Sequence, residues 1–206
     1  MGSWKEGYAL DLHTSSSQPI REMKIIKMLK DGVEKEMTVA GDIIGWDTNR
    51  PEIAEELYRL KYCREKWRAE IIGAAAAEFL KKKLSAWSIH LIIPIPPSDT
   101  TREFQPVYEM SNIIGKLCSI PIDFHTLKKF KSTSQLKEID DPAQRKKVLE
   151  GAFSVHKGSL TGKNLLIFDD LYRSGETLNA ACDIIIKQGN AKGVYVLAIT
   201  KARSKR

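Results

Sequence analysis

Residues 165–177 read LLIFDDLYRSGET and place two adjacent acids, Asp169 and Asp170, at the end of an apolar run. The apolar residues before them are typical of a β-strand that is buried on both faces. A Ser-Gly turn follows and leads into a helix that begins near Thr177. Neighbouring carboxylates repel each other and are costly to bury. The stretch therefore predicts a buried strand that ends at a polar site, with a ligand shared by both acids.

Strand-like and helix-like patterns alternate from residue 89 to the end of the chain. Apolar, β-branched runs typical of buried strands occur at 89–96, 162–170 and 193–202. Helical periodicity occurs at 104–118 and 177–189. This alternation predicts an α/β fold with a parallel sheet flanked by helices, and we expect a further strand to begin near Ile122. Ligands of such sheets bind at the carboxyl ends of the strands, which is where LLIFDD ends.

The N-terminal part of the chain has a different pattern. Residues 7–46 favour extended structure, although 20–32 fit either a strand pair or a short helix. Helices are expected at 51–62 and, in an alanine-rich stretch, at 66–84. We therefore expect an N-terminal α+β subdomain at 1–88 and a separate core at 89–206.

Composition narrows the classes of function. The chain has 206 residues and a net charge of +7, which favours polyanionic partners such as phosphorylated small molecules or nucleic acid. Its three cysteines lie far apart and fit neither a disulfide framework nor a zinc site. No apolar run approaches the ~20 residues that span a bilayer, and the N-terminus lacks the apolar region of a signal peptide. We expect a cytoplasmic protein with no membrane partner.

The turn after the acids has the features of a phosphate site. Gly175 can adopt a backbone conformation closed to other residues, so that successive N–H groups converge on one point. The helix N-terminus and the hydroxyls of Ser174 and Thr177 add donors for a phosphate monoester. Asp169 and Asp170 can accept hydrogen bonds from a diol, and together these groups fit a ribose 5-phosphate. The plainer alternative is that the acids cap a turn and that Ser-Gly only ends the strand.

LLIFDDLYRSGET resembles the ribose-phosphate signature of type I phosphoribosyltransferases. Residues 89–203 more narrowly resemble the ComF-like branch, through IIPIPPSDTTREFQPVYEMSNIIG at 92–115 and STSQLKEIDDPAQRKKVLEGAF at 132–153. GYALDLHT and ELYRLKY in the N-terminal part also resemble that branch, although the zinc ribbon of many members is absent. The resemblance implies a type I phosphoribosyltransferase-like sheet at 89–206 and an N-terminal hood at 1–88.

The resemblance also implies a role for individual residues. Asp169 and Asp170 would hold the ribose hydroxyls, and Mg²⁺ would be bound mainly by the substrate, close to these two acids. The 5-phosphate would be held by Arg173, Ser174, Gly175, Glu176 and Thr177, and Tyr172 would lie beside the ribose of the same ribose 5-phosphate. The pyrophosphate would meet Ser98, Asp99 and Arg102, and a loop over the site would contribute Lys131, Gln135, Lys137 and Arg145. The catalytic candidates are thus Asp169, Asp170, Arg102, Lys131, Gln135 and Arg145.

Two functions remain open at this point. One is an enzyme that transfers ribose 5-phosphate from phosphoribosyl pyrophosphate to a nucleobase-like or amine acceptor. The other is a non-catalytic ComF-like module that binds phosphoribosyl pyrophosphate or a nucleotide 5-monophosphate and acts through a protein or DNA partner, in a branch linked to DNA uptake. A homodimer is compatible with either, and a DNA-binding protein in its own right is a third, weaker reading.

Three residues limit which ligand contacts and substrates of the family can be expected of this chain. Pro96 and Pro97 have no backbone N–H, which removes two donors where many members hold pyrophosphate. Arg173 stands where 6-oxopurine salvage enzymes carry an acid, and a guanidinium cannot accept a proton from the base. Salvage of hypoxanthine or guanine is therefore not expected.

Overall fold

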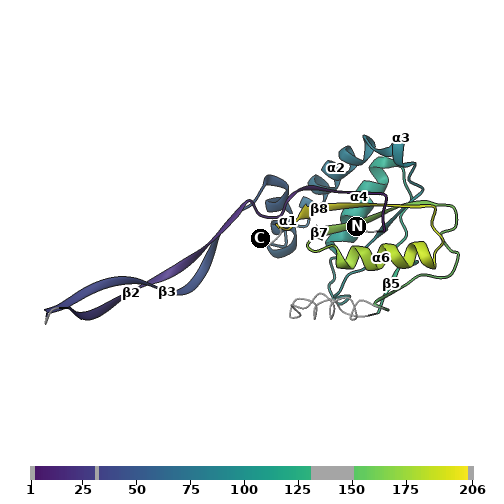
Figure 1. Cartoon of the computed structure of the whole chain (residues 1–206). Helices are drawn as coiled ribbons and strands as arrows, with labels where there is room; N and C mark the ends of the chain where they lie inside the picture. The colour runs from purple at the N-terminus through teal and green to yellow at the C-terminus, as the bar shows by residue number, and fades with distance from the viewer. Residues whose placement is uncertain (1–2, 31–32, 131–150, 204–206) are drawn as a thin grey trace.

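The computed structural model describes residues 3–30, 33–130 and 151–203 (Figure 1). Its centre is a four-stranded sheet in the order β1-β8-β7-β4, in which all neighbouring strands are parallel. The strands are β1 (Glu6–Leu12), β4 (Leu91–Pro94), β7 (Asn164–Tyr172) and β8 (Gly193–Lys201). The predicted α/β fold with a parallel sheet flanked by helices is confirmed.

Strand β7 shows why the apolar run of the sequence had to become an inner strand. Leu165 and Ile167 face one core cluster, which contains residues of helix α6 (Glu176–Lys187). Leu166 and Phe168 face the opposite cluster. All four side chains are fully buried, because successive residues of a strand point to opposite faces and both faces are covered.

The second face of the sheet is covered by helices α1 (Glu52–Tyr62), α2 (Arg68–Lys81), α3 (Leu84–Trp87) and α4 (Pro106–Cys118). Helix α2 packs closely against α4, since a Cβ added at Gly73 would lie 2.7 Å from the side chain of Ile113. The alanine-rich stretch predicted as a closely packed helix therefore has that role. Among the described residues no helix is both long and apolar enough to cross a membrane.

The N-terminal strand belongs to the same sheet as the core. Strand β1 pairs in parallel with β8, from Glu6 opposite Tyr195 to Leu12 opposite Lys201. Helix α1 then packs its buried residues Leu57 and Leu60 into the cluster that contains Ile199 of β8. The boundary expected at residue 88 stays a prediction, and the structure adds that residues on both sides of it share one sheet.

A long ribbon follows β1 and projects away from the sheet (Figure 1). It consists of β2 (Ser16–Lys30) and β3 (Val33–Asn49), which pair antiparallel from Ser16–Asn49 to Lys30–Val33. Of the two alternatives for residues 20–32, the short helix is wrong and extended structure is correct, within the residues that the structure describes. Register shifts near Ile20 and Arg21 mark an irregular section of the ribbon.

The region between α4 and β7 differs from the expected strand. Ile122 makes only an isolated parallel bridge to Ile92, and no strand is assigned there. A short antiparallel pair follows, formed by β5 (Lys128–Lys129) and β6 (Phe153–Ser154). The loop candidates Lys131, Gln135, Lys137 and Arg145 lie outside the described residues, and their roles stay predictions.

Candidate active site

The acids of the signature lie near the carboxyl end of β7, just beyond the last residue that pairs with its neighbour β4. A cavity of about 310 Å³ opens there. The structure brings Asp169, Asp170 and Thr177 to its wall, together with Ser98, Asp99 and Arg102 from the loop after β4. These two groups of candidates are far apart in the sequence, and their meeting at the carboxyl edge of the sheet agrees with the general position of ligands in parallel sheets.

The two carboxylates are held by different partners. The backbone N–H of Asp170 donates to Asp169 Oδ1 at 2.8 Å. Lys61 on α1 donates its Nζ to Asp170 Oδ2 at 2.6 Å. Asp169 Oδ2 and Asp170 Oδ1 accept no hydrogen bond from any residue in the described part of the chain. Each acid thus has one oxygen fixed by the protein and one oxygen open, which suits the two hydroxyls of a diol.

The same packing changes the ionisation of these groups. Burial, followed by the neighbouring charge of Asp170, raises the pKa of Asp169 to about 7. Burial acts to lower the pKa of Lys61, but the ion pair and hydrogen bond with Asp170 outweigh it and raise that pKa. Lys61 therefore stays charged, and near pH 7 the acid pair holds less negative charge than two free carboxylates.

The turn after β7 forms a second, small cavity of about 60 Å³. Gly175 has φ +81°, in the left-handed region, and is the residue before α6. The backbone favours glycine here, and a Cβ at this position would lie 2.6 Å from Tyr172 Oη, so the tyrosine ring would have to shift. Thr177 lines this cavity and also the larger one, so a phosphate in the turn would lie next to the acids. Ser174 Oγ donates to Glu176 Oε2 at 3.0 Å, while Arg173 is exposed.

The loop after β4 is organised by Asp99. Its Oδ1 accepts hydrogen bonds from the N–H and the hydroxyl of Thr101, and Arg102 Nε lies 3.2 Å from its Oδ2. The bonds from Thr101, and then that from Arg102, hold the pKa of Asp99 below its usual value. The Gln105 amide donates to the carbonyl of Asp99 at 2.8 Å. The side chain of Asp99 therefore serves to shape the loop and to orient Arg102.

Two lysines of the cavity were missed by the sequence analysis. Lys129 on β5 donates its Nζ to Ser98 Oγ at 2.7 Å, and burial lowers its pKa. Lys61 lies on the same helix face as the buried residues Ala54 and Leu57, at spacings of seven and four residues. A lysine within a buried stripe needs a partner, and this position is the signal by which Lys61 could have been found.

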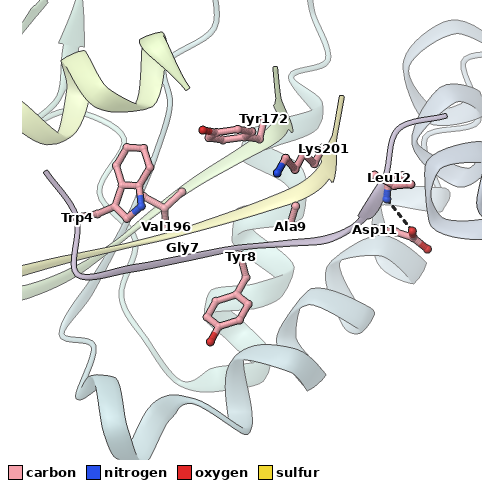
Figure 2. A pocket seen from close by; sticks show the side chains of 9 residues that line it. All are labelled: Trp4, Gly7, Tyr8, Ala9, Asp11, Leu12, Tyr172, Val196 and Lys201. Carbon is pink, nitrogen blue, oxygen red and sulfur yellow. Dashed lines mark hydrogen bonds between the residues drawn. The ribbon is translucent and has the colours of Figure 1, made fainter. Parts of the chain in front are cut away.

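Tyr172 does not line the larger cavity, although it lines the small cavity of the turn together with Asp169. It packs with the core cluster of α6 and lines a separate groove of about 510 Å³ above β1 and β8. Figure 2 shows Trp4 and Tyr172 on the same side of β1, with Tyr8 on the opposite side. Lys201 Nζ lies 5.8 Å from the centre of the Tyr172 ring. Tyr172 also lines the small cavity of the turn, so it separates that turn from the groove.

Comparison with known proteins supports one relationship. No family model matches the chain. The chain is 27% identical over 150 residues to the "Competence protein ComFC" of Bacillus subtilis strain 168, a match that covers 72% of this chain and 59% of ComFC. The chain thus matches about three fifths of the length of that relative.

Two solved structures were also found. One is a purine phosphoribosyltransferase from Pyrococcus horikoshii, with 19% identity, coverage of 66% of this chain and 83% of that one, and a TM-score of 0.38. The other is a hypoxanthine phosphoribosyltransferase from Staphylococcus aureus, with 14% identity, coverage of 65% and 64%, and a TM-score of 0.40. The chain is therefore similar to ComFC over most of its length, and its signature at 165–177 resembles that of type I phosphoribosyltransferases.

Proposed function

We propose that the protein binds phosphoribosyl pyrophosphate with Mg²⁺ and transfers the ribose 5-phosphate to a nucleobase-like or amine acceptor. One observation carries this proposal, namely the pair of open oxygens on Asp169 and Asp170 beside a glycine turn at a helix N-terminus. A diol on the acids and a phosphate in the turn describe a ribose 5-phosphate. Arg102 and Lys129 then lie in the same cavity as candidate cations for the pyrophosphate.

The proposed reaction breaks the bond between the anomeric carbon and the pyrophosphate oxygen, and the electron pair leaves with the pyrophosphate. A nitrogen of the acceptor supplies the electron pair of the new bond and releases a proton. The transition state resembles an oxocarbenium ion, so the residues act by holding the ribose and by stabilising the negative charge of the departing pyrophosphate. Arg102, oriented by Asp99, is the candidate for the second task.

A metal would enter this site with the substrate. The described residues contain no group of three or more His, Cys, Asp or Glu side chains placed to hold an ion. The open oxygens of Asp169 and Asp170 fit the hydroxyls of the sugar, and the sugar hydroxyls and pyrophosphate supply the hard oxygen ligands that Mg²⁺ prefers. When bound, Mg²⁺ would offset part of the charge of the pyrophosphate.

The acceptor is restricted by Arg173. Its guanidinium is exposed beside the phosphate turn and cannot take a proton from a purine nitrogen. Hypoxanthine and guanine are therefore not proposed as acceptors. Lys131, Gln135 and Arg145 remain candidate contacts by resemblance alone.

The second candidate is a binding module without catalysis. Pro96 and Pro97 line the cavity and offer no N–H donors to a pyrophosphate, which favours ligand binding over stabilisation of a leaving group. The similarity to a competence protein adds support for a protein or DNA partner. Under this alternative the ligand is phosphoribosyl pyrophosphate or a nucleotide 5-monophosphate.

One assay separates the two candidates. The protein is incubated with phosphoribosyl pyrophosphate, Mg²⁺ and a panel of amines and nucleobases, and released pyrophosphate is measured beside calorimetric binding. Release that depends on an acceptor, and that is lost in an Asp169→Asn/Asp170→Asn variant, supports the enzyme. Binding without release for every acceptor supports the module, and absence of binding contradicts both.

A further inference from the structure

Lys61 is a residue of the cavity for which the resemblance assigns no role. It lies on α1, in the N-terminal part of the chain, and its partner Asp170 is 109 residues away in the sequence. The side chains of Lys61 and Asp170 are 22% and 14% exposed. Helix α1 is already fixed by the fully buried Leu57 and by Leu60, so the ion pair is not needed to seat the helix. In a largely buried ion pair the cost of desolvation offsets much of the attraction, so net stability alone does not account for the pair, which points to a role in the site.

The position of the ammonium decides which oxygens a ligand can reach. Lys61 Nζ donates a hydrogen bond to Asp170 Oδ2, and the backbone N–H of Asp170 donates one to Asp169 Oδ1. The backbone of Asp170 is itself fixed, because Thr200 Oγ1 lies 3.3 Å from its carbonyl oxygen and His13 Nδ1 lies 3.0 Å from that hydroxyl. Rotation of the Asp170 carboxylate is thus opposed by Lys61, and one acceptor oxygen on each acid remains for a ligand.

The charge of Lys61 also selects the kind of ligand. Two adjacent carboxylates without a counter-charge would attract a bare cation or a proton. Lys61 offsets the charge of one of them from the side of Oδ2. The remaining oxygens are then best suited to neutral donors, and a vicinal pair of hydroxyls supplies two donors at once.

We propose that Lys61 is a positioning residue that makes the acid pair selective for a ribose diol over a 2-deoxyribose. It fixes Asp170 so that each acid presents one oxygen to one hydroxyl. The inference rests on the proposed function, because ribose 5-phosphate is the group that the site is proposed to bind. It adds to that function the residue that sets the choice of sugar.

The test compares two sugar phosphates on matched variants. Calorimetry measures the affinity of the wild type, Lys61→Met, Lys61→Arg and Lys82→Met for ribose 5-phosphate and for 2-deoxyribose 5-phosphate. Lys82 is the control, since it is a largely exposed lysine paired with Glu78 on α2. Thermal unfolding of each variant checks the fold, and Lys61→Gln replaces the methionine variant if that variant does not fold.

We expect the wild type to prefer ribose 5-phosphate by about tenfold, the effect of one hydrogen bond to a charged acceptor. Lys61→Met should reduce this preference to less than about twofold while the affinity for the deoxy compound changes little. Lys61→Arg should keep most of the preference and Lys82→Met all of it.

Three results would overturn the inference. These are an equal affinity of the wild type for both sugars, an unchanged preference in the methionine or glutamine variant, and an equal loss of affinity for both sugars in those variants. If the wild type binds neither sugar phosphate nor phosphoribosyl pyrophosphate, the proposed function itself fails, which is a separate outcome.

Discussion

The groove beside Trp4 and the cavity beside Asp170 are formed by the same sheet but differ in what lines them. The groove is larger, about 510 Å³ against about 310 Å³, and small or aromatic residues such as Gly7, Ala9 and Trp4 form much of its surface (Figure 2). The smaller cavity contains Asp99, Asp169 and Asp170 and, facing them, Lys61, Arg102 and Lys129. Opposite charges gathered in one cavity are typical of a reactive or binding site, whereas volume alone is not.

The difference follows from where each lies on the strands. The groove runs along β1 and β8 and is lined by residues within these strands, together with Trp4 and Tyr172. The cavity lies at the carboxyl ends of β4 and β7, where loops from several elements meet. Polar side chains from distant parts of the chain converge at this edge, so variants of the cavity and its phosphate turn should affect ligand binding more than variants elsewhere.

Among single substitutions, the largest effect on ligand binding is expected for Gly175→Ala. The new Cβ would meet Tyr172 Oη at 2.6 Å and the backbone would be strained at φ +81°, so the turn should lose its shape. We expect the affinity for ribose 5-phosphate to fall about 50-fold in calorimetry. Gly162→Ala is the matched control, because Gly162 also has a positive φ, +75°, but no atom within 4 Å of the new Cβ. Equal losses in both variants would refute the proposed role of the turn.

Asp169→Asn should stabilise the protein in a manner that depends on pH. The pKa of Asp169 in the fold is raised to about 7, so its contribution to stability is complete below the unfolded pKa and is lost as pH rises towards 7. The asparagine variant has no such loss. Its free energy of unfolding should match that of the wild type near pH 4 and exceed it by on the order of 2 kcal/mol at pH 8. Urea titrations at both pH values measure the free energy of unfolding of the two proteins. A difference between them that does not change with pH would contradict the raised pKa of Asp169.

Arg102→Ala tests the part of the cavity that is formed by the loop after β4. We expect about a tenfold loss of affinity for phosphoribosyl pyrophosphate and less than about a twofold change for ribose 5-phosphate, because only the first ligand carries a pyrophosphate. Arg59→Ala is the control, since Arg59 is an exposed residue of α1 that pairs with Glu55. A similar loss for both ligands in Arg102→Ala would place Arg102 at the sugar phosphate instead.

The smallest effect on binding is expected for Trp4→Ala in the groove. Trp4 is half-buried against the core cluster of α6, and its loss should lower the free energy of unfolding by about 2 kcal/mol. The affinity for ribose 5-phosphate should change less than about twofold. Calorimetry and chemical denaturation measure the two quantities, and a clear loss of affinity would show that the groove is part of the binding site.

The sequence alone was enough to predict the features that depend on local pattern, namely an inner strand, the turn after it and the helix that follows. The run Leu165–Phe168 predicted an inner strand because every one of its residues had to be buried. The glycine turn followed from the backbone freedom of Gly175, and the helix after it from its apolar spacing. The pairing of β1 with β8 was not predicted, since residues 6–12 and 193–201 are far apart and local pattern does not specify a partner strand.

The candidate site was predicted only in part, because local sequence pattern does not reveal contacts between distant elements. Lys61 and Asp170 meet only through the packing of α1 on the sheet, which no spacing in the sequence reveals. Tyr172 would share the face of Phe168 if the alternation continued, yet it packs with the α6 cluster on the other face. The chain bends into the phosphate turn at this point, so a rule for regular strands fails there. Asp99, expected only at the pyrophosphate, also organises its own loop.

Asp169 and Asp170 are proposed to bind the ribose of a phosphoribosyl ligand jointly. The decisive experiment is calorimetric titration of Mg²⁺ and phosphoribosyl pyrophosphate into the wild type and the Asp169→Asn/Asp170→Asn variant. We predict binding to the wild type and a loss of affinity of about 100-fold in the variant, with the variant still folded by circular dichroism. Equal affinity of the two proteins for this ligand would contradict the claim.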